Sequence, residues 1–248
     1  MITLPKLDSD TPFPPVDEAL AEPNGLLAFG ADLSPPRLFS AYSQGIFPWF
    51  SEDEPLLWWS PAPRAIIELD DFICSKSLAK LARKRRFTVT LNKAFTAVIE
   101  ACASIPRQQP SAGNISNETW ITSDMQHAYT QLHTLGLAHS VEVWDGNELV
   151  GGLYGVGVGK VYCGESMFHR QSNTSKLAML ALVKHMKSQE MAFIDCQLPT
   201  EHLASLGAKP ISRARFIAML QQNNHTLTEE GRLTPRYQAQ WQSQDITP

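Results

Sequence analysis

The sequence predicts an α+β protein, in which a small N-terminal domain precedes a mixed, mostly antiparallel sheet with its helices. Between residues 138 and 197, stretches rich in β-branched and aromatic residues alternate with turn signals and one helical stretch. Residues 1–62, in contrast, concentrate proline and tryptophan and show no long periodic segment. A chain of 248 residues can form one large domain and one smaller one. We therefore expect two domains, residues 1–62 and 63–248.

The segment from residue 138 to 197 is the predicted centre of the fold. An Asp-Gly pair at residues 145–146 is a strong hairpin signal between its first two strands. A strand followed by a crossover helix and another strand implies right-handed, parallel pairing beside the hairpins. The predicted order is strands Ala138–Trp144, Glu148–Val156 and Lys160–Phe168, helix Thr174–Ser188 and strand Ala192–Gln197.

Start and stop signals predict the remaining helices. Ser34 stands before Pro35, a favoured pair at a helix start, and Gly45 and Gly136 suit helix ends. Ser123 and Gln126 have the spacing of a capping box, and Asn92 is a predicted N-cap. The predicted helices are Pro35–Gln44, Ser75–Arg86, a helix from Asn92 to Ser104, Asp124–Leu135, and one from Ser212 to Gln221, with a strand at Phe87–Leu91.

Composition restricts the class of protein. No apolar run approaches the roughly 20 residues of a membrane span, and the N-terminus lacks the pattern of a signal peptide. We expect a cytoplasmic protein without membrane association. The four cysteines show no C-x-x-C spacing, so we expect buried thiols in a reducing compartment. They are Cys74, Cys102, Cys163 and Cys196.

Positive charge gathers in one stretch of an otherwise acidic chain. The net charge is −4, yet residues 75–107 contain eight basic side chains and a single acid, Glu100. Such an asymmetry favours a local polyanion contact, although a solvated helix face is the commoner reading of a basic run. The candidate nucleic-acid contacts are Lys76, Lys80, Arg83, Lys84, Arg85 and Arg86.

Polar residues on the last two predicted strands mark a candidate site. Strand alternation places Glu165 and Met167 on one face, and Asp195 and Gln197 on one face of the next strand. Strand interiors usually exclude carboxylates, so the pair suggests a lined cleft. A structural carboxylate that caps nearby backbone is an equally good reading of Asp195 alone.

Familiar cofactor motifs are missing. The histidines form no H-E-x-x-H pattern, and no G-x-S-x-G elbow or phosphate-binding P-loop occurs. The glycines between Gly151 and Gly159 lie within a strand and hairpin, where they cannot cradle a nucleotide at a helix start. We expect neither a metal nor a cofactor.

The strand order resembles the GNAT superfamily, whose members move acyl groups onto amines. Members that use acyl-coenzyme A grip its pyrophosphate with a Gly-rich turn at a helix N-terminus. The corresponding junction here, His169–Ser175, contains no glycine. The resemblance implies amine acylation, and the glycine-free junction argues against coenzyme A.

A more specific resemblance covers nearly the whole chain, from Glu22 to about Phe216. The ordered motifs NGLLAFGAD, GIFPWF, LWWSPAPR, TWIT, GGLYG, CGESMF and IDCQ are similar to those of the leucyl/phenylalanyl-tRNA–protein transferase family. The resemblance implies transfer of leucine, phenylalanine or methionine from aminoacyl-tRNA to an N-terminal Arg or Lys of an acceptor protein. It also implies a mark for N-end-rule degradation, a GNAT-like catalytic domain and a monomer.

The resemblance also implies roles for single residues. Asp195 and Gln197 match the pair at the reacting centre, and Glu165 matches the neighbouring acid that helps to position the substrate. Asp195 is expected to orient the acceptor amine and take its proton, directly or through a relay. Trp49 and Trp120 match the tryptophans that hold the terminal adenosine, and the pocket for the transferred side chain uses Leu153, Met167, Met179, Leu182, Met186 and Ile194.

Independent of the resemblance, several of these residues have plainer readings. Met179, Leu182 and Met186 form one helical stripe that suits core packing, and tryptophans commonly fill cores. Two alternative functions stay open: a coenzyme-A-dependent N-acetyltransferase, and a non-catalytic RNA-binding module that uses the basic helix and Trp49.

Overall fold

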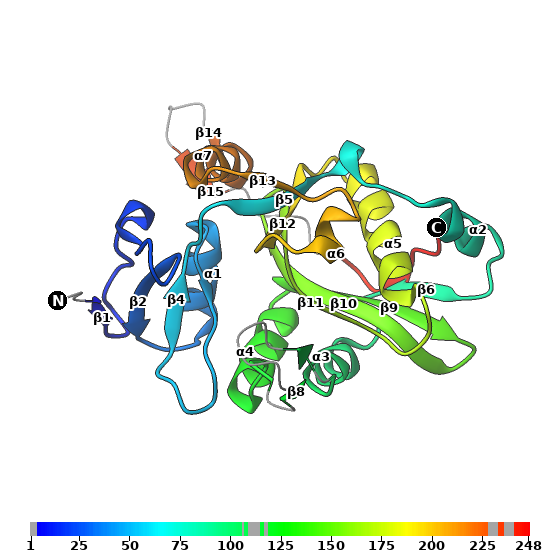
Figure 1. Cartoon of the computed structure of the whole chain (residues 1–248), viewed down its shortest axis with the longest axis horizontal. Helices are drawn as coiled ribbons and strands as arrows, with labels where there is room; N and C mark the ends of the chain where they lie inside the picture. Colours follow the sequence, from blue (N-terminus) through cyan, green and yellow to red (C-terminus); the bar gives the residue numbers. More distant parts are fainter. Residues whose placement is uncertain (1–3, 106, 109–114, 117–118, 228–232, 236–240) are drawn as a thin grey trace.

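The computed structural model describes residues 4–248 except 106, 109–114, 117–118, 228–232 and 236–240. Two larger sheets follow one another along the chain (Figure 1). Residues 6–59 contribute a four-stranded sheet, and the strands from residue 64 onward form an eight-stranded sheet. The mixed α and β composition and the small N-terminal unit agree with the sequence-based expectation.

The N-terminal sheet has the order β1-β2-β4-β3. Helix α1 begins at Pro35, directly after its N-cap Ser34, as the Ser-Pro signal predicts. Its buried face packs against the sheet through Leu38, Ala41 and Tyr42. The elements are β1 (Lys6–Leu7), η1 (Val16–Glu18), β2 (Leu26–Gly30), α1 (Pro35–Ser43), β3 (Phe47–Pro48) and β4 (Leu57–Trp59).

The large sheet has the order β13-β5-β12-β11-β10-β9-β6-β16. β9, β10 and β11 form the predicted antiparallel hairpins, and β12 pairs with β11 in parallel after the crossover helix α5. Its strands are β5 (Arg64–Glu68), β6 (Thr88–Leu91), β9 (Ala138–Asp145), β10 (Glu148–Val158), β11 (Val161–His169), β12 (Phe193–Gln197), β13 (Lys209–Ile211) and β16 (Gln244–Asp245).

Helices cover both faces of the large sheet (Figure 1). Helix α5 lies on one face, with α2 packed against it, while α3 and α4 lie on the other. The helices are η2 (Leu69–Asp71), α2 (Lys76–Arg83), α3 (Phe95–Ala103), α4 (Ser123–Thr134), α5 (Thr174–Ser188), α6 (Glu201–Ala204) and α7 (Arg213–Asn224).

The apolar core consists of two clusters, one on each face of the large sheet. One cluster lies under α5 and includes Leu182 and Met186, and the other lies under α3 and α4. The second cluster continues into the N-terminal unit through Tyr42 and Trp58, so the two sheets share a core. Burial of this continuous apolar surface stabilises the arrangement of the two parts.

A bulge in β11 explains one glycine of β10, because Tyr154 pairs with Ser166 and Gly155 with Gly164, which leaves Glu165 as the extra residue. The pairing of β10 with β11 shifts register between Tyr154 and Gly155. A Cβ atom at Gly155 would lie 2.2 Å from the carbonyl oxygen of Cys163, which is shorter than any tolerated contact. The glycine-rich run therefore serves close strand packing, as its position within a hairpin indicated.

Two helix starts differ from the prediction. Thr122, not Ser123, is the N-cap of α4, where its Oγ1 accepts a hydrogen bond from Met125 N–H. Asn92 caps no helix, because α3 begins only at Phe95. Asn92 instead adopts a left-handed φ of 56° and binds the backbone of Ser140 and Trp241.

The remaining secondary structure consists of two short strand pairs. Short strand pairs form between β7 (Arg107–Gln108) and β8 (Ile115–Ser116), and between β14 (His225–Leu227) and β15 (Leu233–Pro235). Most of residues 105–118, a polar stretch whose role the sequence leaves open, lies outside the described residues. Cys74 is exposed, so the expectation of four buried thiols is wrong for that residue. Among the described residues, no helix is long and apolar enough to cross a membrane.

Candidate active site

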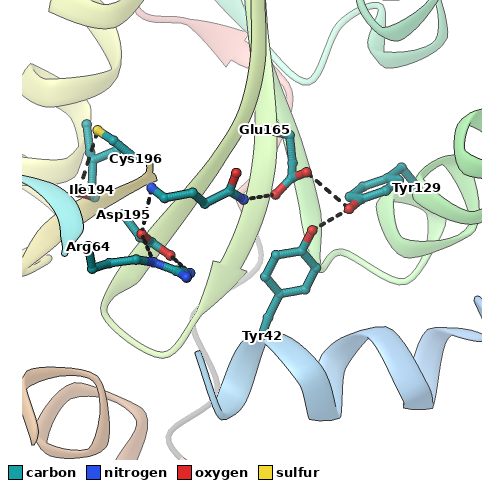
Figure 2. A network of polar contacts seen from close by, with 8 residues as sticks. Tyr42, Arg64, Tyr129, Glu165, Ile194, Asp195 and Cys196 are labelled. Atoms are coloured by element: carbon teal, nitrogen blue, oxygen red, sulfur yellow. Dashed lines mark hydrogen bonds and ion pairs between the residues drawn. The ribbon is translucent and has the colours of Figure 1, made fainter. Parts of the chain in front are cut away.

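The parallel pairing of β11 with β12 brings the predicted reacting residues together. Cys163 lies opposite Asp195 in this ladder, so Glu165, in the middle of β11, and Gln197, the last residue of β12, both lie just beyond it. The Gln197 side-chain amide donates a hydrogen bond of 2.6 Å to Glu165 Oε1. Figure 2 shows these side chains in one chain of polar contacts that runs from Arg64 to Tyr42.

Asp195 is closed off from solvent by Arg64. Its side chain is 1% exposed, and its two oxygens accept hydrogen bonds from Arg64 Nε at 2.8 Å and Nη2 at 2.7 Å. Asp195 Oδ1 also accepts a 2.9 Å bond from Gln197 N–H. The strand pattern suggested that Asp195 lines a cleft, and its burial beside Arg64 contradicts that expectation. Its hydrogen bond from Gln197 N–H connects it to the rest of the network.

Gln197 connects the buried ion pair to Glu165. It adopts a φ of 62°, a left-handed conformation that non-glycine residues seldom hold without support. Its backbone N–H binds Asp195, while its side chain reaches Glu165. Both of its ends are fixed by these two bonds, so the position of Asp195 sets the position of the amide.

Glu165 is partly buried and carries the other end of the network. Its Oε2 accepts a 3.1 Å hydrogen bond from Tyr129 O–H of α4, and Tyr129 O–H in turn bonds Tyr42 O–H of α1. Burial raises the pKa of Glu165 to about 7, although hydrogen bonds from Tyr42, Gln197 and Tyr129 lower it. A carboxyl group with this pKa exchanges protons readily near neutral pH.

The predicted side-chain pocket residues share one buried cluster. Met179, Leu182 and Met186 project from α5 onto the sheet, where Leu153 and Ile194 meet them. All five are at most 4% exposed, and Met167 packs at the edge of the cluster while partly exposed. Met167 lies two residues from Glu165 on β11, but the register shift at Glu165 separates their faces: Glu165 bonds Tyr129 of the cluster under α3 and α4, whereas Met167 packs on the cluster under α5. The expectation that the two side chains share one strand face is therefore wrong.

A cleft lies between the N-terminal unit and α4, but neither of the two predicted adenosine-binding tryptophans is among its lining residues. Trp49 is 43% exposed, and the following residue, Phe50, lines this cleft of about 500 Å³. Trp120 is half-buried and precedes α4, whose residues Asp124 and His127 form the opposite wall. Trp49 is held by an edge contact with Trp59, 5.5 Å between ring centroids.

The six basic residues are all exposed, but they lie at the far end of the molecule from Trp49. Figure 1 shows α2 at one end of the long axis and β4 with its hairpin near the other. Arg86 forms an ion pair with Asp145, whereas Lys76 and Lys80 lie along the outer side of α2. A ligand that touches both regions must be long.

Sequence reasoning missed three members of the network. Arg64 stands in the quoted LWWSPAPR motif, but no spacing ties it to Asp195, 131 residues away. Tyr42 and Tyr129 lie on the buried faces of α1 and α4 and read as core aromatics. Among the described residues, no group of three His, Cys, Asp or Glu side chains could hold a metal ion.

Comparison with known proteins adds a class and a family to this geometry. The family model described as leucyl/phenylalanyl-tRNA protein transferase matches residues 66–221, and its N-terminal-domain model matches residues 31–62. The chain therefore falls among the aminoacyltransferases. It belongs, more narrowly, to the leucyl/phenylalanyl-tRNA–protein transferase family.

Individual relatives agree over nearly their whole length. A leucyl/phenylalanyl-tRNA–protein transferase of Pseudoalteromonas atlantica is 56% identical over 222 residues, which is 90% of this chain and 92% of the relative. One of Pseudomonas aeruginosa is 53% identical over 86% of this chain and 91% of the relative. A solved structure titled L-PGS from Bacillus licheniformis overlaps with a TM-score of 0.37 and 11% identity across 71% of this chain and 55% of that one, too little to carry a fold argument.

Proposed function

We propose that this protein transfers leucine or phenylalanine from aminoacyl-tRNA to the α-amino group of an N-terminal Arg or Lys of an acceptor protein, which marks that protein for N-end-rule degradation. Family membership supports the reaction class. The observation that carries it within the structure is the Glu165–Gln197 pair, a carboxylate with a pKa of about 7 beside a fixed amide donor.

The chemistry requires few groups because the aminoacyl ester is already activated. The neutral α-amine of the acceptor attacks the ester carbonyl carbon, a C–N bond forms, and the C–O bond to the terminal ribose breaks. The amine proton goes to the Glu165 carboxylate and is returned to the departing ribose oxygen, so protons balance. A proton acceptor with a pKa near the working pH serves this step best.

Gln197 and Asp195 then have separate roles. The Gln197 amide lies at the end of β12, where it can bind the substrate or the oxyanion that develops on the carbonyl. Asp195 orients Gln197 through the backbone bond and does not touch the amine. This assignment keeps the relay form of the expected Asp195 role and drops the direct one.

The donor is proposed to bind with its terminal adenosine between Trp49 and Trp120 and its side chain among Leu153, Met167, Met179, Leu182, Met186 and Ile194. An exposed ring such as Trp49 suits base stacking, worth about 1–3 kcal/mol per base. Methionine side chains adapt to both branched and aromatic groups. The position of Met167 two residues from Glu165 on β11 supports a side-chain pocket near the reacting ester.

The body of the tRNA is proposed to reach the basic helix, with Lys76, Lys80, Arg83, Lys84, Arg85 and Arg86 facing its phosphates. The position of α2 at the opposite end of the long axis from the N-terminal sheet suits a long ligand such as a tRNA (Figure 1). Replacing Lys80, Arg83 and Lys84 by alanine is expected to weaken tRNA binding and lower the salt slope by about 2, as measured by filter binding between 50 and 300 mM salt. An unchanged slope would assign the basic residues to solvent alone.

Other features of the fold follow the same proposal. We place the domain boundary between residues 62 and 63, where the chain passes from the last N-terminal strand to β5 of the large sheet. The catalytic part is proposed to be GNAT-like, supported by the parallel β11–β12 pair around the reacting residues. We further propose a cytoplasmic monomer that needs no cofactor, since the aminoacyl ester supplies the activation.

The test is a transfer assay with labelled leucyl-tRNA or phenylalanyl-tRNA and peptides that begin with Arg, Lys or Ala. The proposal expects label on the Arg and Lys peptides, none on the Ala peptide, and no requirement for ATP or coenzyme A. Acetylation from acetyl-coenzyme A would instead support an N-acetyltransferase. RNA binding without any transfer would support a binding module.

A further inference from the structure

Arg64 is buried as deeply as any side chain of the network. Its side chain is 1% exposed, and Nε and Nη2 make parallel hydrogen bonds of 2.8 and 2.7 Å to the two oxygens of Asp195. This fork geometry fixes the plane of the carboxylate as well as its position, which a single donor cannot do. Burial acts to lower the pKa of Arg64, but the Asp195 charge raises it overall, so the pair stays ionic.

Two aromatic rings, one from the N-terminal part of the chain and one from its C-terminal part, contact the Arg64 guanidinium. It lies 4.9 Å from the ring centroid of Phe47 in β3 and 4.5 Å from that of Phe216 in α7. Such contacts restrict a buried cation and are stronger when water is excluded. Arg64 is therefore the point at which the N-terminal sheet, α7 and the reacting strands meet.

A displacement of Asp195 has a direct route to Glu165. Asp195 Oδ1 accepts the N–H of Gln197, whose left-handed backbone and side-chain amide are both set by that bond. The amide ends 2.6 Å from Glu165 Oε1. One residue thus separates the ion pair from the reacting carboxylate, and an error of about 1 Å in such a site can reduce the rate by about 10²-fold.

We propose that Arg64 is a positioning residue for transfer: its fork on Asp195 holds the Gln197 amide in the orientation that presents it to Glu165 and to the reacting ester. The inference rests on the proposed function of the Glu165–Gln197 pair. It assigns to a residue outside the predicted site a part in the reaction through geometry rather than through contact with substrate.

The first test compares Arg64→Lys with a matched control, Arg37→Lys. Arg37 is also a buried arginine, 8% exposed, with its guanidinium 4.9 Å from the Phe13 ring, but it binds backbone carbonyls such as that of Thr11 at 2.8 Å. Arg64→Lys keeps the charge and loses the fork, so kcat for leucyl transfer is expected to fall about 10²-fold. KM for aminoacyl-tRNA should stay within about twofold, and Arg37→Lys should keep kcat within about threefold, because neither change touches the donor site.

The second test follows the Glu165 carboxyl itself by ¹³C NMR of the free protein, with Glu165→Gln to assign its signal. The groups that face Glu165 are Tyr42 of α1, Tyr129 of α4, Asp195 and Gln197 of β12, and Arg64 across the ion pair. Arg64→Gln leaves the Asp195 charge unbalanced and should move the Glu165 midpoint up by about 1 pH unit. Asp195→Asn leaves the Arg64 charge unbalanced and should move it down.

The outcomes separate the two proposals. Absence of leucyl transfer by the wild type would refute the proposed function, whereas the NMR shifts test the Arg64 coupling without any substrate. If a single variant does not fold, the neutral pair Arg64→Gln with Asp195→Asn replaces it. Low kcat in that folded pair, with normal kcat in Arg37→Lys, supports the inference. Normal kcat in Arg64→Lys or in the neutral pair, or equal NMR midpoints in all variants, overturns it.

Discussion

Two glutamates on the large sheet share a raised pKa but differ in everything around it. Glu142 lies on β9 and Glu165 on β11, the two strands that flank β10. Burial raises the pKa of each carboxyl group. Glu142 is fully buried, whereas Glu165 is partly open.

The partners of the two carboxylates explain the difference in role. Glu142 accepts hydrogen bonds from the hydroxyls of Thr90 and Ser140 and from the backbone N–H groups of Lys93 and Ala94. These four hydrogen bonds hold the residues before α3 against β9, and they occupy both oxygens of the Glu142 carboxylate. Glu165, in contrast, is partly exposed and accepts hydrogen bonds from side chains, among them those of Tyr129 and Gln197.

The comparison teaches that a raised pKa does not by itself mark a functional site. Burial raises the pKa of any carboxyl group. A carboxyl group that is enclosed by its hydrogen-bond donors has a structural role. A partly exposed carboxyl group that is bound by side chains can exchange these hydrogen bonds for bonds to a substrate. The variants below test this distinction.

The largest expected difference concerns the transfer rate. Glu165→Gln removes the proton acceptor and should reduce kcat/KM about 10²- to 10³-fold. Glu142→Gln should leave kcat per folded molecule within about threefold, because Glu142 lies beyond the reach of substrate. The measurement is leucyl transfer at pH 8 with active protein quantified by tRNA binding. Equal losses in both variants would erase the distinction.

The free energy of unfolding should fall more in Glu142→Gln than in Glu165→Gln. In Glu142→Gln the new amide N–H₂ faces donors that previously bound an oxygen, so buried donors lose their partners. The free energy of unfolding should fall by about 2 kcal/mol, measured by urea denaturation at pH 7. Glu165→Gln should change it less, because the Glu165 side chain itself is partly exposed. A larger loss in Glu165→Gln would contradict the assigned roles.

A third expected effect is the pH dependence of stability. The folded pKa of Glu165, about 7, exceeds its ordinary value of 4.5, so the folded state binds more protons between those values. Its contribution to stability is fully present below pH 4.5 and is lost as pH rises through 7. The fall in unfolding free energy between pH 5 and 7.5 should therefore be shallower in Glu165→Gln than in the wild type. Identical slopes would show that the carboxyl group titrates normally.

Much of the fold could be predicted because its signals are local. The Asp-Gly turn and the strand formers predict the β9–β10 hairpin, and the crossover helix matches α5 at both of its ends. The prediction at Asn92 is wrong because a carboxylate from another strand, Glu142, takes the N–H groups that an N-cap would take. Such a replacement depends on tertiary contact, which sequence spacing does not record.

For the site, the sequence could predict the polar residues of the two strands but not the contacts that bury and orient them. Alternation along two strands brought Glu165, Asp195 and Gln197 into one hypothesis, and the described geometry joins them in one network. It could not indicate that Arg64 would bury Asp195, since the two lie far apart in the chain and meet only when β5 pairs with β12. The tyrosines were hidden for a similar reason, because a buried aromatic reads as core until its hydroxyl partner is known.

The pH dependence of transfer under single-turnover conditions tests the role of Glu165 most directly. In the wild type, two groups should govern the rise of rate with pH: Glu165 near 7 and the acceptor amine at about 7.7–8.0. Glu165→Gln should lose the limb near 7 and keep the amine limb, while Glu142→Gln should keep both. A limb near 7 that persists in Glu165→Gln would contradict the account.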